Sequence, residues 1–401
     1  MILLPDKTDI LIVGAGIIGL TLAMELLARG SEQIVIIEKE PELGLHASGR
    51  NSGVLHAGIY YAPESLKAQM CLKGNFLMRA YCREKGLPLL EKGKVIVTRS
   101  SSEMPMLAEL YRRATANGAM VEIIDEKQLA EIEPNAKTAG KALFSHHTAQ
   151  VDPQAVLKSI QKELAGSARA RIVTNCRLTG LAGSRTAVTT RGKIAFSRCV
   201  NAAGAHCDRV ARAFGLSHRY RLIPFKGIYR KLKKTAPYTV NGNIYPVPDI
   251  RNPFLGVHFT RSAHGDVYIG PTAIPAFGRE NYGIIAGIDP EGPSIALADL
   301  VLFCTNPKFR TVAVSEPKKY VFSVFFREAR KLVKRLRPGD IEPCDKVGIR
   351  AQLVDWNTKE MVMDFLVRQD GEVVHILNPV SPAFTCSMEL ARQIVQTYFQ
   401  N

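Results

Sequence analysis

The chain has 401 residues, of which 46% are hydrophobic and 22% charged, values typical of a globular protein with room for two domains. No apolar run reaches the ~18–20 residues that a membrane-spanning helix needs, and the strand expected from Asp9 leaves no room for a signal or transit peptide. The eight cysteines form no CxxC pair, so we expect reduced thiols and no metal site. The net charge of +16 predicts an acidic partner, which could be an anionic substrate, a membrane surface or a nucleic acid.

The first elements along the chain are typical of a dinucleotide-binding unit. The segment TDILIVGAGIIGLTLAMELLARGSEQIVIIEKE reads as a strand, a glycine turn, a helix and a second strand that ends in an acid. Gly14, Gly16 and Gly19 fit GxGxxG, which permits a tight turn, a close pyrophosphate and close helix–strand packing. Glu38, 19 residues after the last glycine, would accept hydrogen bonds from the adenosine ribose. The motif alone does not separate FAD from NAD.

In a second segment, GLHASGRNSGVLHAGIYY (44–61), most side chains are too small or too polar for a core strand, yet several others are ionisable or aromatic. A third, VNAAGAHCDRVA (200–211), reads as another strand-to-helix turn, which contains Gly204. With GxGxxG near the N-terminus, these segments resemble the FAD-dependent D-amino-acid-oxidase superfamily, which implies FAD as the cofactor. A flavin is a flat ring that lies against backbone, which accounts for the small residues of 44–61.

Within that superfamily the chain is most similar to the L-2-hydroxyglutarate dehydrogenase/oxidase family, from about residue 8 to 395. The similarity is specific in five blocks: 46–75, 244–261, 270–282, 347–352 and 378–387. The chain departs from the family pattern at Arg50, Lys226, Gly278 and Phe384. These departures leave the exact 2-hydroxy acid open.

The resemblance implies an α/β fold in which an FAD-binding Rossmann-type domain is interleaved with a substrate domain built on a mostly antiparallel sheet with helices. We expect the FAD-binding domain to comprise 1–85, 145–215 and 345–401. The substrate domain would comprise 86–144 and 216–344, including a basic amphipathic helix over about 318–337. Ser381 to Ser387 would precede a helix whose N-terminus points at the flavin, where negative charge develops on reduction. The residues expected to bind FAD are Gly14, Gly16, Ile17, Ile18, Gly19, Glu38, Lys39, Ser48, Asn51, Ser52, Gly53, Gly204, Ser381, Pro382, Ala383 and Thr385.

Oxidation of a 2-hydroxy acid requires a base for the hydroxyl proton while the C2 hydride leaves to the flavin, and histidine is poised for this near neutral pH. His56, directly after the flavin-contacting loop, is the first candidate, and His258 is the second. Either could instead be a structural histidine of the interior. His46 lies in a context that resembles amine dehydrogenases with a histidine-linked flavin, so covalent attachment of FAD stays open.

A dicarboxylate substrate needs cations at both ends. Arg350 lies where the superfamily often has its carboxylate-binding arginine, and a guanidinium fork matches a carboxylate bidentately. We therefore count Arg350 with the two histidines among the catalytic candidates. The candidates for the second carboxylate, with surface roles as the alternative, are Arg50, Tyr60, Tyr61, Lys226 and Arg261.

Residues 308–337 contain ten Lys or Arg and two Glu, a net +8 and half of the total excess. From Val321, the run VFSVFFREARKLVKRL has helical periodicity, with phenylalanines on one face and basic residues on the rest. Such a helix could lie in an anionic membrane surface, but a core-packed helix with a solvated basic exterior has the same pattern. The resemblance implies electron delivery to a quinone pool or to O2. We therefore expect a cytoplasmic protein that is peripheral on the inner face of the cell membrane.

The expected function is FAD-dependent oxidation of (S)-2-hydroxyglutarate, or a close 2-hydroxy acid, to the 2-oxo acid, 2-oxoglutarate. An amino-acid or amine oxidase of the same fold is the main alternative, because one arginine and a flavin serve either substrate. An RNA-binding, tRNA-modifying flavoprotein is an alternative of another class. The cations cluster on one phenylalanine-bearing helix and do not line a groove with stacking aromatics, so we expect no nucleic-acid partner.

Overall fold

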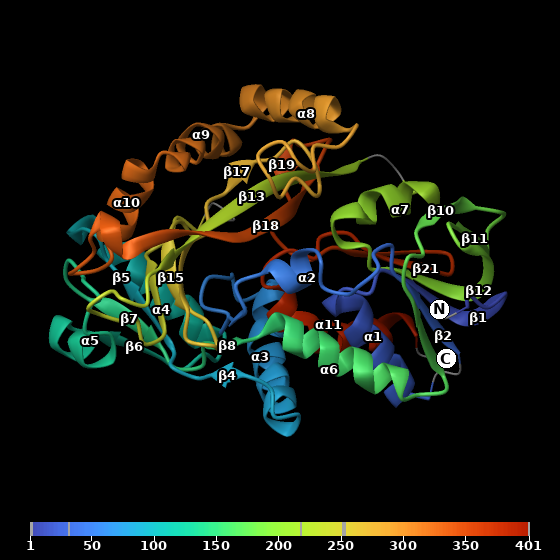
Figure 1. Ribbon diagram of the computed structural model, residues 1–401, viewed down its shortest axis with the longest axis horizontal. Coiled ribbons are helices and arrows are strands. Elements are labelled where there is room, and N and C mark those ends of the chain that lie inside the picture. Colours follow the sequence, from blue (N-terminus) through green and yellow to red (C-terminus); the bar gives the residue numbers. More distant parts are fainter. Residues whose placement is uncertain (1–2, 31–32, 217–218, 251–253, 400–401) are drawn as a thin grey trace. The chain divides into compact units, whose positions relative to one another are not determined.

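The computed structural model describes residues 3–30, 33–216, 219–250 and 254–399 (Figure 1). The chain forms two compact units, each assembled from separate segments. Unit 1 contains Met1–Arg50, Pro153–Pro224 and Arg350–Asn401, and unit 2 contains Asn51–Asp152 and Phe225–Ile349. Residues 251–253, inside one of the five similar blocks, lie outside the described residues.

The boundaries of the two units differ from the predicted ones, most of all near residue 50. Residues 51–85 belong to unit 2 because helix α3 (Leu66–Glu84) is tied to other segments of that unit. The buried amide of Asn75 on α3 donates to the carbonyls of Leu55 and His147, at 3.0 Å each. Helix α3 is thus hydrogen-bonded to segments of unit 2 on both sides of it in the sequence.

Unit 1 is built on an eight-stranded sheet with the order β10-β11-β12-β1-β2-β9, in which β21 also pairs with β12 and β20 with β21. The strands are β1 Lys7–Val13, β2 Ile34–Ile37, β9 Ala170–Val173, β10 Leu178–Leu181, β11 Thr186–Thr189, β12 Gly192–Asn201, β20 Val367–Asp370 and β21 Val373–Ile376. β1, β2, β9, β12 and β21 pair in parallel. The run IVII of β2 is buried throughout, as expected for a parallel strand that is covered on both faces.

The helices of unit 1 are α1 Ile17–Ala28, α2 Ala47–Arg50, α6 Pro153–Ala165, α7 Cys207–Ala213 and α11 Ala383–Tyr398, with a 3-10 turn η2 at Gly204–His206. α1 packs against α6 and α11 (Figure 1). The buried Thr21 hydroxyl of α1 donates to the Ser387 carbonyl of α11 at 3.1 Å. This contact joins the first helix of the chain to the last.

The larger sheet, most of which lies in unit 2, has ten strands in the order β19-β18-β13-β16-β15-β14-β5-β7-β6, with β17 beside β13. Its strands are β5 Lys94–Val97, β6 Val121–Ile124, β7 Ala142–Ser145, β13 Tyr220–Leu232, β14 Asn243–Pro246, β15 His258–Arg261, β16 Val267–Gly270, β17 Ile274–Pro275, β18 Ile341–Asp355 and β19 Glu360–Met361. A small antiparallel sheet contains β3 Val54–Leu55, β4 Leu89–Leu90 and β8 Ala149–Val151.

The remaining helices belong to unit 2. They are α3, α4 Met104–Ala116, α5 Glu126–Ile132, α8 Gly292–Thr305, α9 Pro307–Ser315 and α10 Phe322–Arg330, with 3-10 turns η1 Ser101–Glu103, η3 Pro317–Tyr320 and η4 Pro338–Asp340. The predicted fold class is confirmed: a Rossmann-type parallel sheet is interleaved along the chain with a mostly antiparallel one. None of the helices in the described ranges has both the length and the apolar character that a membrane span requires.

Strand alternation gives the sheet of unit 2 two different faces. One face is apolar, and it forms a core with α10 that includes Val95, Ile244 and Phe259. The residues next to them along β5, β14 and β15 are Lys94, Tyr245 and His258, whose side chains point to the other face. Lys94, Tyr245 and His258 therefore share one face of the sheet.

The basic segment is not the long helix predicted over about 318–337. α10 spans only Phe322–Arg330, because the backbone after it hydrogen-bonds to residues 135–137. Phe325 is 2% exposed and lies in the core of unit 2, and two further phenylalanines pack against this core. The phenylalanine face of α10 is therefore turned inward, so that its apolar periodicity reflects core packing.

Candidate active site

The glycine turn joins β1 to α1 at the carboxyl end of the parallel strands of unit 1. Gly14 has φ +108°, a conformation that favours glycine, and a Cβ there would lie 2.6 Å from the Ala202 carbonyl oxygen. A Cβ on Gly19 would lie 2.0 Å from the Gly14 carbonyl oxygen. The first glycine thus allows two backbone turns to meet, and the last allows α1 to pack closely on β1, as the motif predicts.

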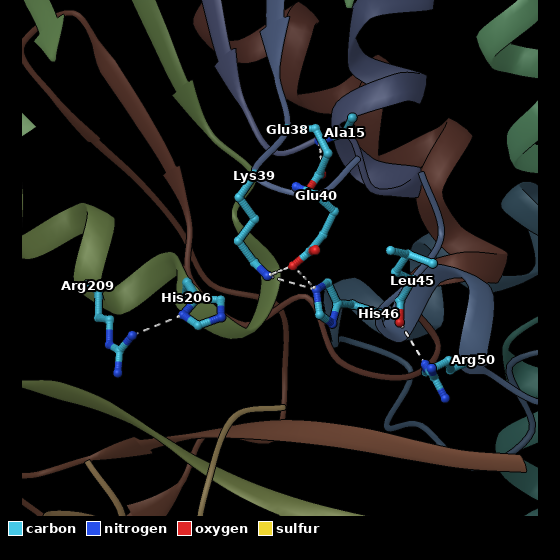
Figure 2. Close-up of polar contacts among 9 residues, drawn as sticks. All are labelled: Ala15, Glu38, Lys39, Glu40, Leu45, His46, Arg50, His206 and Arg209. Atoms are coloured by element: carbon cyan, nitrogen blue, oxygen red, sulfur yellow. Dashed lines mark hydrogen bonds and ion pairs between the residues drawn. The ribbon is translucent and has the colours of Figure 1, made fainter. Parts of the chain in front are cut away.

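Two polar side chains of unit 1 approach the start of α1. The Ile17 N–H donates to Ser48 Oγ at 2.9 Å, and a Cβ on Gly16 would come equally close to that oxygen. Glu38, directly after β2, accepts a hydrogen bond from the Ala15 N–H at 3.0 Å (Figure 2). The fold therefore brings Gly16, Glu38 and Ser48 together.

Lys39, Glu40 and His46 form a charged cluster beside this turn (Figure 2). His46 Nε2 lies 2.9 Å from Glu40 Oε1 and 2.8 Å from Lys39 Nζ, and Lys39 Nζ also contacts Glu40 Oε1. Partial burial raises the pKa of Glu40, but hydrogen bonds from Lys39 and His46 outweigh it and leave the pKa below its usual value. The histidine that could carry a covalent flavin is thus paired with a carboxylate.

The 200–211 turn reaches the same edge of the sheet. The Ala202 N–H donates to the Val13 carbonyl at 3.0 Å, and Gly204 begins η2 with φ +55°. Just beyond it, Arg209 and His206 Nδ1 lie 3.4 Å apart (Figure 2). The second strand-to-helix turn therefore lies against the first, as the sequence pattern indicates.

α11 starts earlier than predicted. The Cys386 N–H already donates to the Pro382 carbonyl at 3.0 Å, so the helix begins at Ala383 and not after Ser387. Ser381 and Pro382 precede it, and the buried Thr385 lies in its first turn. The expected FAD contacts at this end are therefore placed at and just before a helix N-terminus.

The cations predicted for the second carboxylate hydrogen-bond to backbone carbonyls. Arg50 Nε donates to Leu45 at 2.7 Å, Lys226 Nζ to Gly283 at 2.5 Å and Arg261 Nη1 to Val240 at 3.3 Å. Burial lowers the pKa of Lys226. Arg261 shares a face of β15 with Phe259 and lies on the opposite side of that strand from His258. Arg350, half-buried on β18, belongs to unit 1.

The loop from Asn51 to His56 opens unit 2. Gly53 has φ +74°, and its N–H donates to Asn51 Oδ1 at 2.8 Å, so this stretch, with Ser52 between them, forms a tight turn before β3. His56 follows β3 and is 8% exposed. Its carbonyl accepts a hydrogen bond from the Asn75 amide at 3.1 Å. The backbone carbonyl of the first candidate base is therefore held by α3.

His258 begins β15 and stacks on Tyr245 of β14, with 3.7 Å between ring centroids and 23° between ring planes. Its Nδ1 lies 2.8 Å from the Gly256 carbonyl oxygen. Because a carbonyl only accepts, Nδ1 carries the hydrogen and Nε2 of the neutral ring has the lone pair. A buried imidazole fixed in this tautomer is suited to accept a proton at Nε2.

Tyr60 and Tyr61 are oriented differently. The ring of Tyr60 is buried, and burial, reinforced by Tyr245, raises the pKa of its phenol well above the usual value. Tyr61 is half-buried and stands edge-on to Tyr60, with 6.5 Å between centroids.

Two residues that the sequence analysis did not name, Tyr245 and Lys94, lie beside the candidate residues Tyr60 and His258. The only local signal for Lys94 is a cation at the start of the apolar strand KVIV.

A model described as FAD dependent oxidoreductase matches residues 9–397, nearly the whole chain. This chain belongs to the FAD-dependent oxidoreductase family.

Two curated relatives are similar to this chain over more than nine-tenths of its length. The mitochondrial L-2-hydroxyglutarate dehydrogenase of Caenorhabditis briggsae is 34% identical over 405 residues, which cover 97% of this chain and 92% of the relative. The L-2-hydroxyglutarate dehydrogenase of Escherichia coli strain K12 is 33% identical over 400 residues, covering 96% and 92%. The FAD-bound L-alpha-glycerophosphate oxidase of Mycoplasma pneumoniae, at 20% identity, has the same fold, with a TM-score of 0.75 over 99% of this chain and 96% of that one. The resemblance drawn from the sequence is confirmed.

FAD is the cofactor of this FAD-dependent oxidoreductase, and the residues of unit 1 fit it. A phosphate group can approach the start of α1 because Gly14, Gly16 and Gly19 carry no Cβ and the helix N-terminus attracts negative charge. Ser48 adds a hydroxyl there, and Glu38 adds a carboxylate that suits ribose hydroxyls. These are the donors and acceptors that the phosphate–ribose part of FAD requires.

Proposed function

We propose that this FAD-dependent oxidoreductase oxidises (S)-2-hydroxyglutarate, the L enantiomer, to 2-oxoglutarate. The observation that carries the proposal is the similarity to L-2-hydroxyglutarate dehydrogenases over more than nine-tenths of both chains. The fixed tautomer of His258 supports it, because the reaction needs a base. An amino acid would need no such base when it reacts as the free amine.

The reaction breaks the O–H and C2–H bonds of the substrate and forms the C2 carbonyl. Bound FAD supplies the acceptor for the hydride that leaves C2. We assign the hydroxyl proton to Nε2 of His258, whose opposite nitrogen is fixed by Gly256. His56 is the alternative base. This assignment predicts that His258→Asn lowers kcat about 100-fold or more and that His56→Asn lowers it much less.

Arg350 is proposed to bind a substrate carboxylate. Its guanidinium presents two parallel N–H donors, which a lysine cannot do. Arg350→Lys should therefore raise KM for the hydroxy acid strongly while a positive charge is kept. Arg185, an exposed arginine paired with Glu372, is the matched control, and Arg185→Lys should leave KM unchanged.

The decisive experiment is anaerobic reduction of the flavin. The purified holoprotein is mixed with (S)-2-hydroxyglutarate, its R enantiomer, (S)-lactate or L-glutamate, and the loss of the oxidised-flavin absorbance is followed. Fast bleaching by (S)-2-hydroxyglutarate alone supports the proposal. Bleaching by L-glutamate instead would identify the protein as an amino-acid oxidase. Bleaching by lactate would show that its substrate is another 2-hydroxy acid.

We further propose that the electrons pass to a membrane quinone and that the protein associates peripherally with the inner face of the cell membrane. The surface concerned consists of the exposed apolar residues of α8 and of the segment 284–288 that precedes it, here called the α8 surface. Ile284 is 87%, Ile285 77%, Leu297 63% and Leu300 59% exposed. α8 also has a separate buried side, which includes Ile295, Ala298 and Leu302.

Charge supports an anionic membrane as the partner of the α8 surface. The next elements of unit 2, α9, η3 and α10, carry Lys308, Arg310, Lys318, Arg327 and Arg330. Each cation near an anionic bilayer contributes about 1 kcal/mol, and exposed isoleucine and leucine side chains add apolar contact. The apolar contact is thus assigned to α8, whereas the sequence had suggested α10.

Vesicle flotation tests the α8 surface. Wild-type protein should float with vesicles of phosphatidylcholine and phosphatidylglycerol at low salt, and much less with phosphatidylcholine alone. Ile284→Asp/Ile285→Asp and Leu297→Asp/Leu300→Asp should lose this binding, whereas Met120→Asp, at an exposed methionine elsewhere in unit 2, should keep it. Binding that is equal in all variants would contradict the assignment. Reduction of a quinone analogue without formation of hydrogen peroxide in air would identify the acceptor, and peroxide would identify O2.

A further inference from the structure

Lys94 is a lysine in the interior of unit 2. It begins β5, and its side chain is 1% exposed. Its Nζ has no hydrogen-bond partner among the residues that the structure describes. A buried ammonium in this position is costly in free energy, since it has left water without gaining a hydrogen bond.

Two aromatic rings contact the ammonium. Nζ lies 4.6 Å from the centroid of the Tyr60 ring and 4.9 Å from that of Tyr245, distances at which a cation is attracted to a ring face. Burial, partly opposed by the Cys71 thiol on α3, lowers the pKa of Lys94 to about 7. The amine is therefore charged and attracted to both rings when the pH is below its pKa of about 7. The attraction is lost when the pH rises above this value and the amine deprotonates.

The Tyr245 ring connects Lys94 to the proposed base. β5, β14 and β15 are neighbours in the sheet, and Lys94, Tyr245 and His258 come from these three strands in that order. We propose that Lys94 is a positioning residue for His258: its side chain holds the Tyr245 ring, and this ring fixes the plane of the imidazole that accepts the substrate proton. The inference rests on the proposed function, because it takes His258 as the base.

Packing alone does not call for a lysine here. Its neighbours Val95, Ile96 and Val97 are fully buried and apolar, and a methionine would fill a similar volume without a charge. The titratable groups that face Lys94 are the Cys71 thiol and the phenols of Tyr60 and Tyr245, and burial raises the pKa of both phenols. A desolvated cation kept without a compensating acid is typical of functional sites.

Lys94→Met tests the proposal, with Val95→Ala, on the opposite face of β5, as the packing control. Lys94→Met should melt at the same or a higher temperature than wild type, while kcat falls about 10- to 100-fold and KM changes little. Wild-type kcat should decline above about pH 7, and this decline should be absent in the variant. Val95→Ala should lower the melting temperature and leave kcat and its pH profile unchanged.

A second variant and a second readout make the test decisive. Tyr245→Leu should lower kcat by a similar factor. The double variant Lys94→Met/Tyr245→Leu should have nearly the same kcat as Tyr245→Leu alone, because both substitutions break the same chain of contacts. Imidazole resonances of His258 in a ¹⁵N-histidine NMR spectrum should shift in Lys94→Met without any substrate. Unchanged resonances and kcat in folded Lys94→Met protein, or a large loss of its melting temperature, would overturn the proposal. If wild type fails to oxidise the hydroxy acid, the proposed function fails, and the NMR comparison still decides whether Lys94 positions His258.

Discussion

The carboxylate of Glu38 is held against the backbone of Ala15. Its Oε2 accepts the Ala15 N–H at 3.0 Å, and Oε1 accepts the Glu40 N–H at 3.1 Å. The acid that follows β2 is thereby fixed beside the turn that follows β1, at the strand ends where α/β folds bind dinucleotides. Two backbone groups set its orientation.

Replacement of this acid should weaken cofactor binding. In Glu38→Gln the side chain keeps its size but loses its charge and one acceptor, so we expect the Kd for FAD to rise roughly tenfold, or about 1.5 kcal/mol. Titration of the apoprotein with FAD, followed by flavin fluorescence, gives the value. Glu25→Gln, at a residue of α1 that pairs with Arg29, is the control and should bind FAD like wild type. An unchanged Kd in Glu38→Gln would remove Glu38 from the cofactor site.

Gly19 should not tolerate a Cβ. In Gly19→Ala the new methyl group would lie 2.0 Å from the Gly14 carbonyl oxygen, so α1 must move away from β1. We expect the free energy of unfolding to fall by about 3 kcal/mol, or the protein not to accumulate in folded form. Thermal unfolding compares it with Gly180→Ala, since a Cβ at Gly180 meets nothing within 4 Å. Equal stability of the two variants would show that the turn is not as tight as described.

Phe325 distinguishes a buried α10 from one that lies in a membrane. Phe325→Ala should lower the free energy of unfolding by about 3–5 kcal/mol, because it leaves a cavity in the core of unit 2. Vesicle binding by the folded fraction should be retained. Leu300→Ala, on the α8 surface, should show the reverse: nearly unchanged stability and weaker vesicle binding. Loss of vesicle binding in folded Phe325→Ala protein would restore the original expectation for α10.

Asp299 should make stability depend on pH. Both of its carboxylate oxygens are buried without a hydrogen-bond partner among the described residues, and burial raises the pKa to about 7 from 3.8. A raised pKa means that folding disfavours the ionised form. The cost is therefore absent below about pH 3.8, grows as pH rises, and is complete above about pH 7.

Asp299→Asn should remove this cost. The variant should melt at a higher temperature than wild type at pH 8, and the difference should shrink toward pH 5. Asp125 is the contrasting control, because the backbone N–H of Gln128 lowers its pKa. Its contribution to stability is present above its unfolded pKa and is lost as the pH falls, so Asp125→Asn should not gain stability at pH 8. A pH-independent difference for Asp299→Asn would mean that its carboxyl is not desolvated.

Much of unit 1 follows from short stretches of sequence. The glycine spacing, the buried strands around it and Glu38 predict the turn, because each requirement acts within one strand–helix–strand segment. The start of α11 was misplaced because its first turn contains residues such as Phe384 and Thr385, which have little helical preference of their own. The N–H of Cys386 bonding to Pro382 decides that boundary.

The amino-acid sequence by itself determined the family, the cofactor and the interleaved fold, since these are encoded in local patterns and in blocks shared with relatives. Only the tertiary structure decided which face of α10 is buried, that Arg261 points away from His258, and that Lys94 reaches His258 through Tyr245. The physical reason is that periodicity shows that a face is apolar but not what covers it. Contacts between residues far apart in the chain depend on how strands are ordered in a sheet, which no single segment specifies.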